Sequence, residues 1–251
     1  MTRVNKLFFP ILVVFALLSI SCSKAPVATN DSAKPSANLS PIDPATTATI
    51  SGTVSFAGTP PTPEKIDMSA DPACKGDNSW RPIITDNGRL ANVLVYVKDG
   101  LGERKFNPPP AKLVIEQKGC TYHPHVAAVM AGQPVEFLDD DMTMHNVHPK
   151  TKNNKEWNEA EQANGGSVTR KFEKPELMIP VGCNQHPWMK MYLNVMPNPF
   201  YAVTGTDGSF ELKGLPPGTY TIAAVQEKLG EKTQTITLGP RDDKQSVTFG
   251  Y

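Results

Sequence analysis

The sequence predicts an all-β protein. Its 251 residues include 24 prolines, and its apolar residues fall in short runs that alternate with polar ones, as in 48–56. Such alternation is typical of half-buried strands, and the prolines and glycines between the runs mark turns. Few segments carry a long helical periodicity. The chain beyond its first 47 residues is therefore expected to fold into sheets joined by many turns.

The strand signals recur along the chain. We expect strands over 48–56, 90–97, 112–116, 135–138, 177–183 and 191–196, and another after the turn at 215–218. Asp207-Gly208 predicts a hairpin, because this dipeptide favours tight turns between paired strands. Pro180 cannot donate to a sheet ladder, so it predicts a bulge or an edge position. The polar run 150–166 is expected to be a loop or an insertion without chemistry.

The N-terminal residues are expected to be an export signal. Arg3 and Lys6 precede an apolar stretch over 7–18 that is short for a membrane span, which is typical of a signal peptide over 1–21. The stretch ends at Cys22 in a sequence that resembles the bacterial lipobox, so Cys22 is the expected lipidation site. Residues 22–47 would then form the lipidated start and a flexible tether. Cleavage nearby without lipidation, giving a free secreted protein, is the alternative.

The charge of the exported part does not indicate a nucleic-acid partner. Removal of 1–21 takes away Arg3 and Lys6 and leaves 23 basic and 25 acidic residues. Domains that bind nucleic acid are usually strongly basic. We therefore expect no nucleic-acid binding, and a location in the periplasm or on the outer surface, lipid-anchored to a bacterial membrane.

Two segments carry the residues that indicate chemistry. Cys183-Asn184-Gln185-His186-Pro187-Trp188-Met189 places a thiolate, an imidazole and a thioether on one short loop, and His145-Asn146-Val147-His148 supplies another imidazole from upstream. Two His, one Cys and a weak axial Met form the ligand set of a mononuclear blue-copper site. Thiolate and thioether favour Cu(I) and imidazole tolerates Cu(II), so one set serves both oxidation states.

These motifs resemble those of the cupredoxins of the amicyanin and plastocyanin type. The resemblance covers 112–197 and includes the spacing of the ligand loop, the upstream H-N-V-H and an A-G-x-x-V-x-F-like strand at 131–137. It implies a Greek-key β-sandwich with one type 1 copper as cofactor. The implied copper ligands are His145, Cys183, His186 and Met189. Met191, at the longer spacing found in other members, is the alternative axial ligand.

The resemblance also implies supporting residues. Asn146 is expected to hydrogen-bond to the opposing ligand loop and hold the ligands in place. Trp188 is expected to form part of a docking surface or a partly buried lid. His148 is expected to be a loop histidine, because the trigonal plane is already full. We expect structural roles for His123 and His125, with a second metal site as the alternative. We expect ordinary packing for four methionines, with assistance in Cu(I) delivery as the alternative: Met142, Met144, Met178 and Met196.

The cysteine and histidine counts narrow the class of site. With Cys22 and Cys183 assigned, Cys74 and Cys120 remain, and an exported protein is expected to pair them as a disulfide. A single cysteine in the ligand loop excludes a binuclear CuA centre, and five histidines are too few for a multicopper oxidase. No hydrolase triad, phosphate loop or carboxylate pair stands out. We therefore expect no enzyme activity.

The regions on either side of 112–197 resemble a second family. Residues 206–220 are similar to the motif of the carboxypeptidase regulatory-like domain, a small transthyretin-like β-sandwich, and 50–54 resembles its opening strand. This implies one sandwich split between 48–111 and 198–251, with the cupredoxin domain 112–197 inserted. Two consecutive domains with a break near 197–199 are the simpler alternative.

Together these expectations describe an electron carrier. The copper would cycle between Cu(I) and Cu(II) and exchange electrons with transient redox partners through an exposed edge of His186. The alternative is a periplasmic protein that stores or delivers copper, which would hold the metal as Cu(I) and give it up to an acceptor protein.

Overall fold

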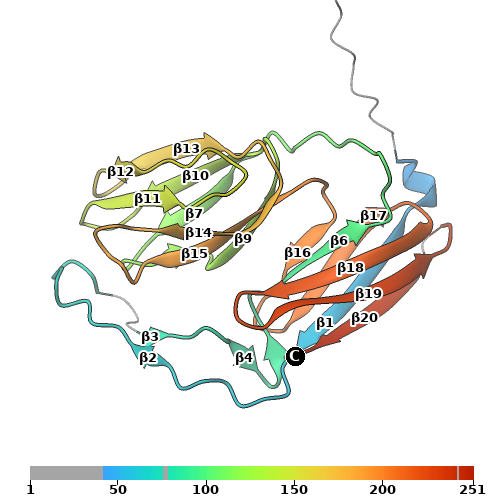
Figure 1. Cartoon of the computed structure of the whole chain (residues 1–251), viewed down its shortest axis with the longest axis horizontal. Coiled ribbons are helices and arrows are strands. Elements are labelled where there is room, and N and C mark those ends of the chain that lie inside the picture. Colours follow the sequence, from blue (N-terminus) through green and yellow to red (C-terminus); the bar gives the residue numbers. More distant parts are fainter. Residues whose placement is uncertain (1–41, 76–78, 242) are drawn as a thin grey trace, which may run out of the picture. The chain divides into compact units, whose positions relative to one another are not determined.

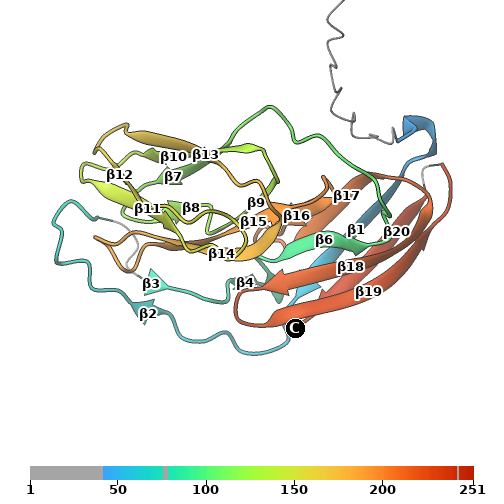
Figure 2. The ribbon, with the colours of Figure 1, turned by 45° about the horizontal axis from the view of Figure 1, so that its top comes forward.

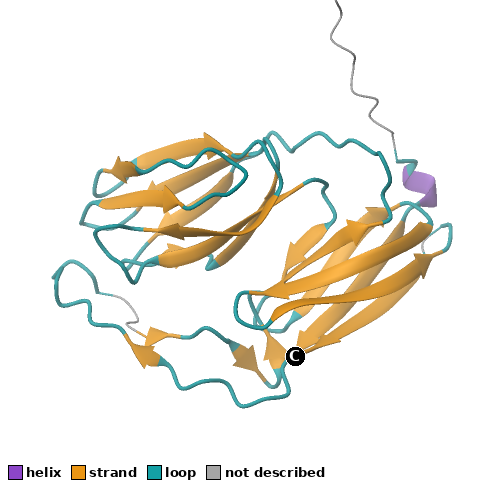
Figure 3. Ribbon diagram, viewed as in Figure 1, coloured by secondary structure: helices purple, strands orange, loops and turns teal. Residues whose placement is uncertain are grey.

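The computed structural model describes residues 42–75, 79–241 and 243–251. Strands dominate them, and the one helix in this part of the chain is the short 3-10 turn η1 (Pro44–Thr46) (Figure 3). The predicted all-β class is confirmed. No helix within the described ranges is long and apolar enough to cross a membrane. The predicted signal peptide, Cys22 and most of the predicted tether lie outside the described residues.

Two sheets form a first β-sandwich from both ends of the described chain (Figure 1). One sheet has the order β17-β1-β5-β4, with β20 also paired to β1, and the other has the order β16-β6-β18-β19. The bounds are β1 (Ala48–Ser55), β4 (Thr85–Asp86), β5 (Arg89–Leu90), β6 (Leu94–Asp99), β16 (Tyr201–Val203), β17 (Ser209–Leu215), β18 (Gly218–Gln226), β19 (Gly230–Leu238) and β20 (Lys244–Gly250). A single hydrophobic cluster lies between the two sheets.

Strand β1 joins the two ends of the chain. It pairs antiparallel with β17 and parallel with β20, and its fully buried Ile50 and Val54 enter the shared cluster. Gly52 allows these strands to approach, because a Cβ there would lie 1.8 Å from the carbonyl oxygen of Val247. The segment 48–56, in which apolar and polar residues alternate, therefore forms a strand with a partner on each side.

The hairpin predicted at Asp207-Gly208 is wrong. Strand β17 after this turn pairs with β1, whereas β16 before it pairs with β6 of the other sheet. The turn itself forms, since the Gly208 amide donates to the carbonyl of Gly205 at 2.9 Å and Gly208 has a φ of +66°. Turn chemistry is local, so it marks where the chain reverses and not which strands pair.

The second β-sandwich consists of strands from the middle of the chain (Figure 2). One sheet has the order β13-β10-β7-β8 and the other β12-β11-β14-β15-β9. The bounds are β7 (Leu113–Gln117), β8 (Tyr122–His123), β9 (Val126–Met130), β10 (Pro134–Asp139), β11 (His145–Pro149), β12 (Glu159–Glu161), β13 (Ser167–Lys171), β14 (Glu176–Gly182) and β15 (Lys190–Met196).

A second hydrophobic cluster fills this sandwich. Ile115 and Phe137 enter it from one sheet and Ile179 and Leu193 from the other, all four with at most 1% exposure. The bulge predicted near Pro180 is confirmed, since the register of β14 against β15 shifts between Glu176 and Ile179. Strand β11 begins at the same end of the sandwich where its antiparallel partner β14 ends, so the start of β11 lies beside the loop that follows β14.

A long excursion leaves the first sandwich between β1 and β4. It contains the two-stranded pair β2 (Glu64–Lys65) and β3 (Ser79–Trp80). We call its residues 66–75 the strap. The predicted disulfide is confirmed: Cys74 of the strap is bonded to Cys120, in the turn between β7 and β8. The strap is therefore covalently fastened to the second sandwich.

Candidate metal centre

Three predicted ligands meet at one end of the second sandwich. His145 is the first residue of β11, and Cys183 and His186 lie in the loop between β14 and β15. The Nδ1 atoms of His145 and His186 are 2.9 Å apart, and Cys183 Sγ is 3.8 Å from His186 Nδ1. All three side chains are buried, and one donor atom from each lies within 4.8 Å of the others.

The donor set suits a soft metal ion such as copper. Cys183 is the one free cysteine among the described residues, and its buried sulfur accepts from the Asn146 amide at 3.5 Å. Burial alone would raise the pKa of the Cys183 thiol, but hydrogen bonds from His145 and from nearby amides lower that pKa below its ordinary value. A thiolate beside two imidazole nitrogens is the trigonal set that copper favours.

The loop geometry supports these donors. The Met189 amide donates to the His186 carbonyl at 2.9 Å, which closes a tight turn between them. Asn146 Oδ1 accepts from the Asn184 amide at 2.7 Å and from the Cys183 thiol at 3.3 Å, as expected for a residue that holds the opposing loop. Met189 and Met191 are both fully buried in the same cluster, so burial does not distinguish the two possible axial ligands.

The outer nitrogen of His145 is held by a carboxylate of its own sandwich. His145 Nε2 lies 2.9 Å from Asp141 Oδ2, which turns Nδ1 toward the metal centre. The same carboxylate accepts from the amides of Gly119 and Cys120 at 2.6 and 2.8 Å. Asp141 therefore fixes the His145 ring and the β7–β8 turn together. Such outer contacts orient metal-binding histidines.

The outer nitrogen of His186 is held by the strap. His186 Nε2 lies 3.1 Å from Asp71 Oδ2, which also accepts from the Thr143 hydroxyl at 2.6 Å. The hydrogen bond from the Thr143 hydroxyl, and to a smaller extent that from the Ala73 amide, lowers the pKa of the Asp71 carboxyl. His186 is only 4% exposed. The expected open edge of His186 is therefore wrong, because the strap covers it with a carboxylate.

The disulfide joins the strap, which carries Asp71, to the turn whose amides donate to Asp141. Cys74 follows Asp71 by three residues and its amide donates to the Asp71 carbonyl at 3.0 Å. Cys120 donates its own amide to Asp141. Two further groups of donor residues include Cys74 or Cys120, but both sulfurs are used in the disulfide. The three-donor group with Cys183 is thus the one with a free thiol.

A buried acidic cluster lies behind His145. Asp139 and Glu161 are almost completely buried, and Gln117 Nε2 donates to Glu161 Oε2. Burial raises the pKa of Glu161 to about 7 and raises the pKa of Asp139. Glu161 stands opposite His145 in the pairing of β12 with β11. The polar run 150–166, expected to carry no chemistry, therefore places a titrating carboxyl beside the site.

The other singled-out residues take varied positions. Trp188 is half-buried and its ring centroid is 5.2 Å from that of His186. His148 does not lie at the candidate metal centre, since its ring nitrogens are hydrogen-bonded to Asn184 and Glu156. The packing expected of Met142 and Met144 is wrong, because they are 77% and 38% exposed. They flank Thr143, whose hydroxyl donates a hydrogen bond to Asp71 of the strap.

Sequence reasoning missed the carboxylates. Asp141 had a usable signal, since it lies four residues before His145 at the end of an acidic run. Asp71 had no such signal from a nearby predicted ligand, because 115 residues separate it from His186. Only its place three residues before a disulfide cysteine sets it apart.

Comparisons with known proteins give partial structural matches. No protein-family model and no curated protein matches the chain. Solved structures similar to it include the Cu-containing nitrite reductase NirK from Thermus scotoductus SA-01, at 20% identity and a TM-score of 0.33 over 39% of this chain and 25% of that one. The chain thus spans about a quarter of that enzyme's length.

Two smaller proteins match along nearly their whole length. The novel purple cupredoxin from Nitrosopumilus maritimus is 21% identical with a TM-score of 0.29, over 34% of this chain and 99% of that one. Amicyanin from Paracoccus versutus is 17% identical with a TM-score of 0.31, over 41% of this chain and 97% of that one. The functional argument below depends on the donor geometry of this chain and not on these matches.

Proposed function

We propose that this protein is an exported electron carrier with one type 1 copper bound by His145, Cys183, His186 and Met189. The observation that carries the proposal is the approach of two imidazole Nδ1 atoms to 2.9 Å beside a buried free thiol. Copper held there would supply one-electron chemistry by cycling between Cu(I) and Cu(II). The protein residues hold the donors in a fixed arrangement that serves both oxidation states.

The surroundings of the donors support transfer of electrons rather than catalysis. Asp71 and Asp141 occupy the outer nitrogens of the two histidines, and the donors are buried among apolar side chains. His145, Cys183 and His186 are each at most 4% exposed. We therefore propose a carrier without enzyme activity that serves transient redox partners.

The rest of the chain is assigned by the same proposal. We infer a transthyretin-like sandwich split between 48–111 and 198–251, because β1 is paired with both β17 and β20 from the far end of the chain. Export and a lipid anchor at Cys22, in the periplasm or on the outer surface, are proposed from the N-terminal sequence, and the disulfide is consistent with an oxidising compartment.

One observation favours a second function, the storage or delivery of copper. Met142 and Met144 expose their thioethers immediately before His145, and thioethers are soft ligands that suit Cu(I). A copper chaperone would use such groups to receive or pass on the ion.

The optical and spin-resonance spectra of the copper-loaded protein test both functions. A strong thiolate-to-Cu(II) charge-transfer band with fast electron exchange supports the carrier, while copper bound only as Cu(I) and readily lost to an acceptor supports delivery. Met189→Leu and Met191→Leu are the matched pair for the axial ligand. A spectrum altered by Met191→Leu and unchanged by Met189→Leu would reverse that assignment.

A further inference from the structure

The two cysteines of the disulfide stand beside the carboxylates that hold the candidate metal centre. Donor atoms of Asp71 and Cys74 lie within 4.8 Å of each other, and so do those of Cys120 and Asp141. The bond between Cys74 and Cys120 joins these two groups, with the Cα atoms 5.3 Å apart. Each sulfur therefore has a carboxylate of its own within reach, and the two sulfurs lie side by side.

On the strap, hydrogen bonds fix Asp71 and Cys74 without the help of the disulfide. The Asp71 carboxylate accepts from the Ala73 amide at 2.9 Å and from the Thr143 hydroxyl at 2.6 Å. The Cys74 amide donates to the Asp71 carbonyl at 3.0 Å, and the Asp71 amide donates to the Met68 carbonyl at 3.2 Å. Because Thr143 belongs to the second sandwich, we expect Asp71 to stay in place when the disulfide is broken.

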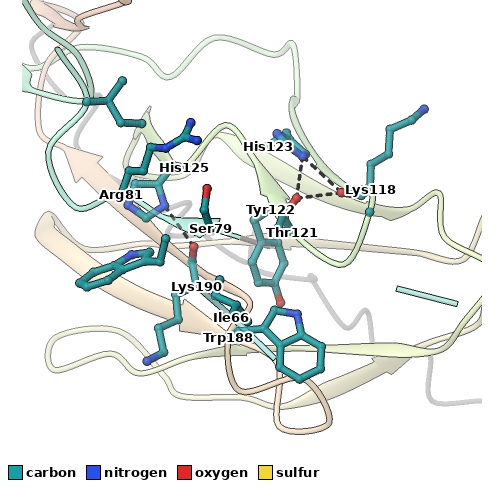
Figure 4. Close-up of a pocket in the computed structure, with 13 residues that line it drawn as sticks. Ile66, Ser79, Arg81, Lys118, Thr121, Tyr122, His123, His125, Trp188 and Lys190 are labelled. Atoms are coloured by element: carbon teal, nitrogen blue, oxygen red, sulfur yellow. Dashed lines mark hydrogen bonds between the residues drawn. The ribbon is translucent and has the colours of Figure 1, made fainter. Parts of the chain in front are cut away.

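The turn that carries Cys120 is held by hydrogen bonds of its own. The Lys118 amide donates to the Thr121 carbonyl at 3.0 Å, and the Thr121 hydroxyl donates to the Lys118 carbonyl at 2.8 Å. Figure 4 shows these two residues together with His123, whose Nε2 lies 2.8 Å from the Thr121 hydroxyl. The Cys120 amide donates to Asp141 at 2.8 Å. Cys120 is therefore also expected to keep its position without the disulfide.

The disulfide is open to small molecules from the strap side. A cavity of about 620 Å³ lies there, and Asp71 and Cys74 are among the residues that line it. Both are half-buried, whereas Cys120 is completely buried. A small reductant or a metal ion can therefore reach the sulfur of Cys74 through this cavity.

The two carboxylates have room for one more ligand each. An ionised carboxylate offers about four acceptor positions. Within the described part of the chain, each of the two has three hydrogen-bond partners: Ala73, Thr143 and His186 for Asp71, and Gly119, Cys120 and His145 for Asp141. An ion can therefore bind both carboxylates while these hydrogen bonds remain.

We propose that reduction of this disulfide creates a zinc site formed by Asp71, Cys74, Cys120 and Asp141. A dithiol supplies two electrons and two protons and is itself oxidised to a disulfide. The bond between Cys74 and Cys120 breaks, and each sulfur takes one proton. Binding of Zn²⁺ then displaces both protons, because the thiolate is the metal ligand. Zn²⁺ accepts sulfur and oxygen donors in a tetrahedral arrangement, so the ion replaces the disulfide as the crosslink between the strap and the second sandwich.

Cobalt titration of the full chain with Cys22→Ser and Cys183→Ser tests the proposal. The chain has four cysteines, so this double variant retains only Cys74 and Cys120 as thiols. A water-soluble phosphine reduces the disulfide and is removed before Co²⁺ is added. We expect a thiolate-to-cobalt charge-transfer band and the visible bands of tetrahedral Co²⁺, both lost on addition of Zn²⁺. The oxidised sample of the same variant should show neither.

Carboxylate variants distinguish the site from two unassisted thiols. Asp71→Asn should lower the Co²⁺ affinity about tenfold or more, whereas Asp67→Asn, which changes an exposed carboxylate of the same strap, should leave the affinity unchanged. Zn²⁺ should also raise the urea midpoint of the reduced chain and not that of the oxidised chain, and this holds even if reduction loosens the fold. The absence of a cobalt–thiolate band after reduction, or equal effects of the two Asp variants, would overturn the proposal.

The zinc site goes beyond the electron-carrier function and does not rest on it. The Nδ1 atoms of His145 and His186 face each other, and Asp71 and Asp141 lie at the outer Nε2 atoms. The double variant lacks the Cys183 thiolate, so its cobalt bands report on the zinc site alone. A type 1 copper spectrum of the unaltered chain without these cobalt bands refutes the zinc site and leaves the proposed function, and the reverse result refutes the proposed function only.

Discussion

The two imidazoles of the candidate metal centre are held by carboxylates from different parts of the chain. Asp141 lies four residues before His145 in the same sandwich and also accepts from two backbone amides. Asp71 reaches His186 from the strap, 115 residues earlier in the chain. The first carboxylate is part of the local fold, and the second arrives with a separate segment. We therefore expect Asp141 to govern stability and Asp71 to govern access to the site.

Loss of the disulfide is expected to have the largest effect. The Cys74→Ala and Cys120→Ala double variant removes a crosslink over 46 residues, for which chain entropy predicts a loss of about 4 kcal/mol in the free energy of unfolding. Urea denaturation of the metal-free chain measures it. In the folded variant, diethylpyrocarbonate should modify His186 and leave His145 protected. Equal modification of both rings would contradict the expectation that the strap controls access to His186 alone.

The pH dependence of stability is expected to come from the His145 side. The folded chain raises the pKa of Glu161 from 4.5 to about 7, so between these values it binds more protons than the unfolded chain. The free energy of unfolding should therefore fall as the pH rises from about 4.5 to 7, by up to about 3 kcal/mol, and stay low above pH 7. Denaturation of Glu161→Gln across this range should lack that fall. If the free energy of unfolding of Glu161→Gln depended on pH as in the unaltered protein, Glu161 would not be the source of that dependence.

Removal of Asp141 should destabilise the fold by about 2 kcal/mol, because the Gly119 and Cys120 amides lose their acceptor. The neighbouring Asp140→Ala is the matched control, since Asp140 is exposed and its carboxylate pairs with the exposed Lys118. Thermal or chemical denaturation compares the two. Equal losses would show that the buried hydrogen bonds of Asp141 contribute little.

Removal of Asp71 should change access more than stability. Asp71→Ala loses one partly exposed set of hydrogen bonds, which predicts a loss of about 1 kcal/mol, and about a tenfold loss of copper affinity through the freed His186 ring. Mass spectrometry after diethylpyrocarbonate treatment should find His186 newly modified. His123, which is exposed in both proteins, provides the reactive control. Continued protection of His186 would mean that the strap covers this ring without the help of Asp71.

The candidate donors were predictable from sequence because a copper site of this kind needs several of them at close spacing. Cys183, His186 and Met189 share one loop, and His145 is the first residue of a strand that begins beside that loop. Strand positions were predictable for a similar reason, since alternation is a local property. Within each motif and each strand, these predictions depend on residues a few positions apart.

The errors concern long-range pairing. The turn at Asp207-Gly208 was recognised but its strands pair elsewhere, and the burial of His186 depends on a strap from another part of the chain. Glu161 was missed because a short strand inside a polar run carries little apolar signal. Tertiary contacts decide such features, and one sequence alone does not encode them in a readable pattern.

The Cys74–Cys120 bond sets an order of events for this protein. Disulfides form in oxidising compartments and are rare in the cytosol, so a newly made chain carries the donors His145, Cys183 and His186 before it carries the crosslink. If the protein is exported as proposed, the strap becomes fastened over His186 only after export. On this proposal the candidate metal centre is completed outside the cytoplasm, and an ion that enters before the strap is fixed encounters a more open site than one that enters afterwards.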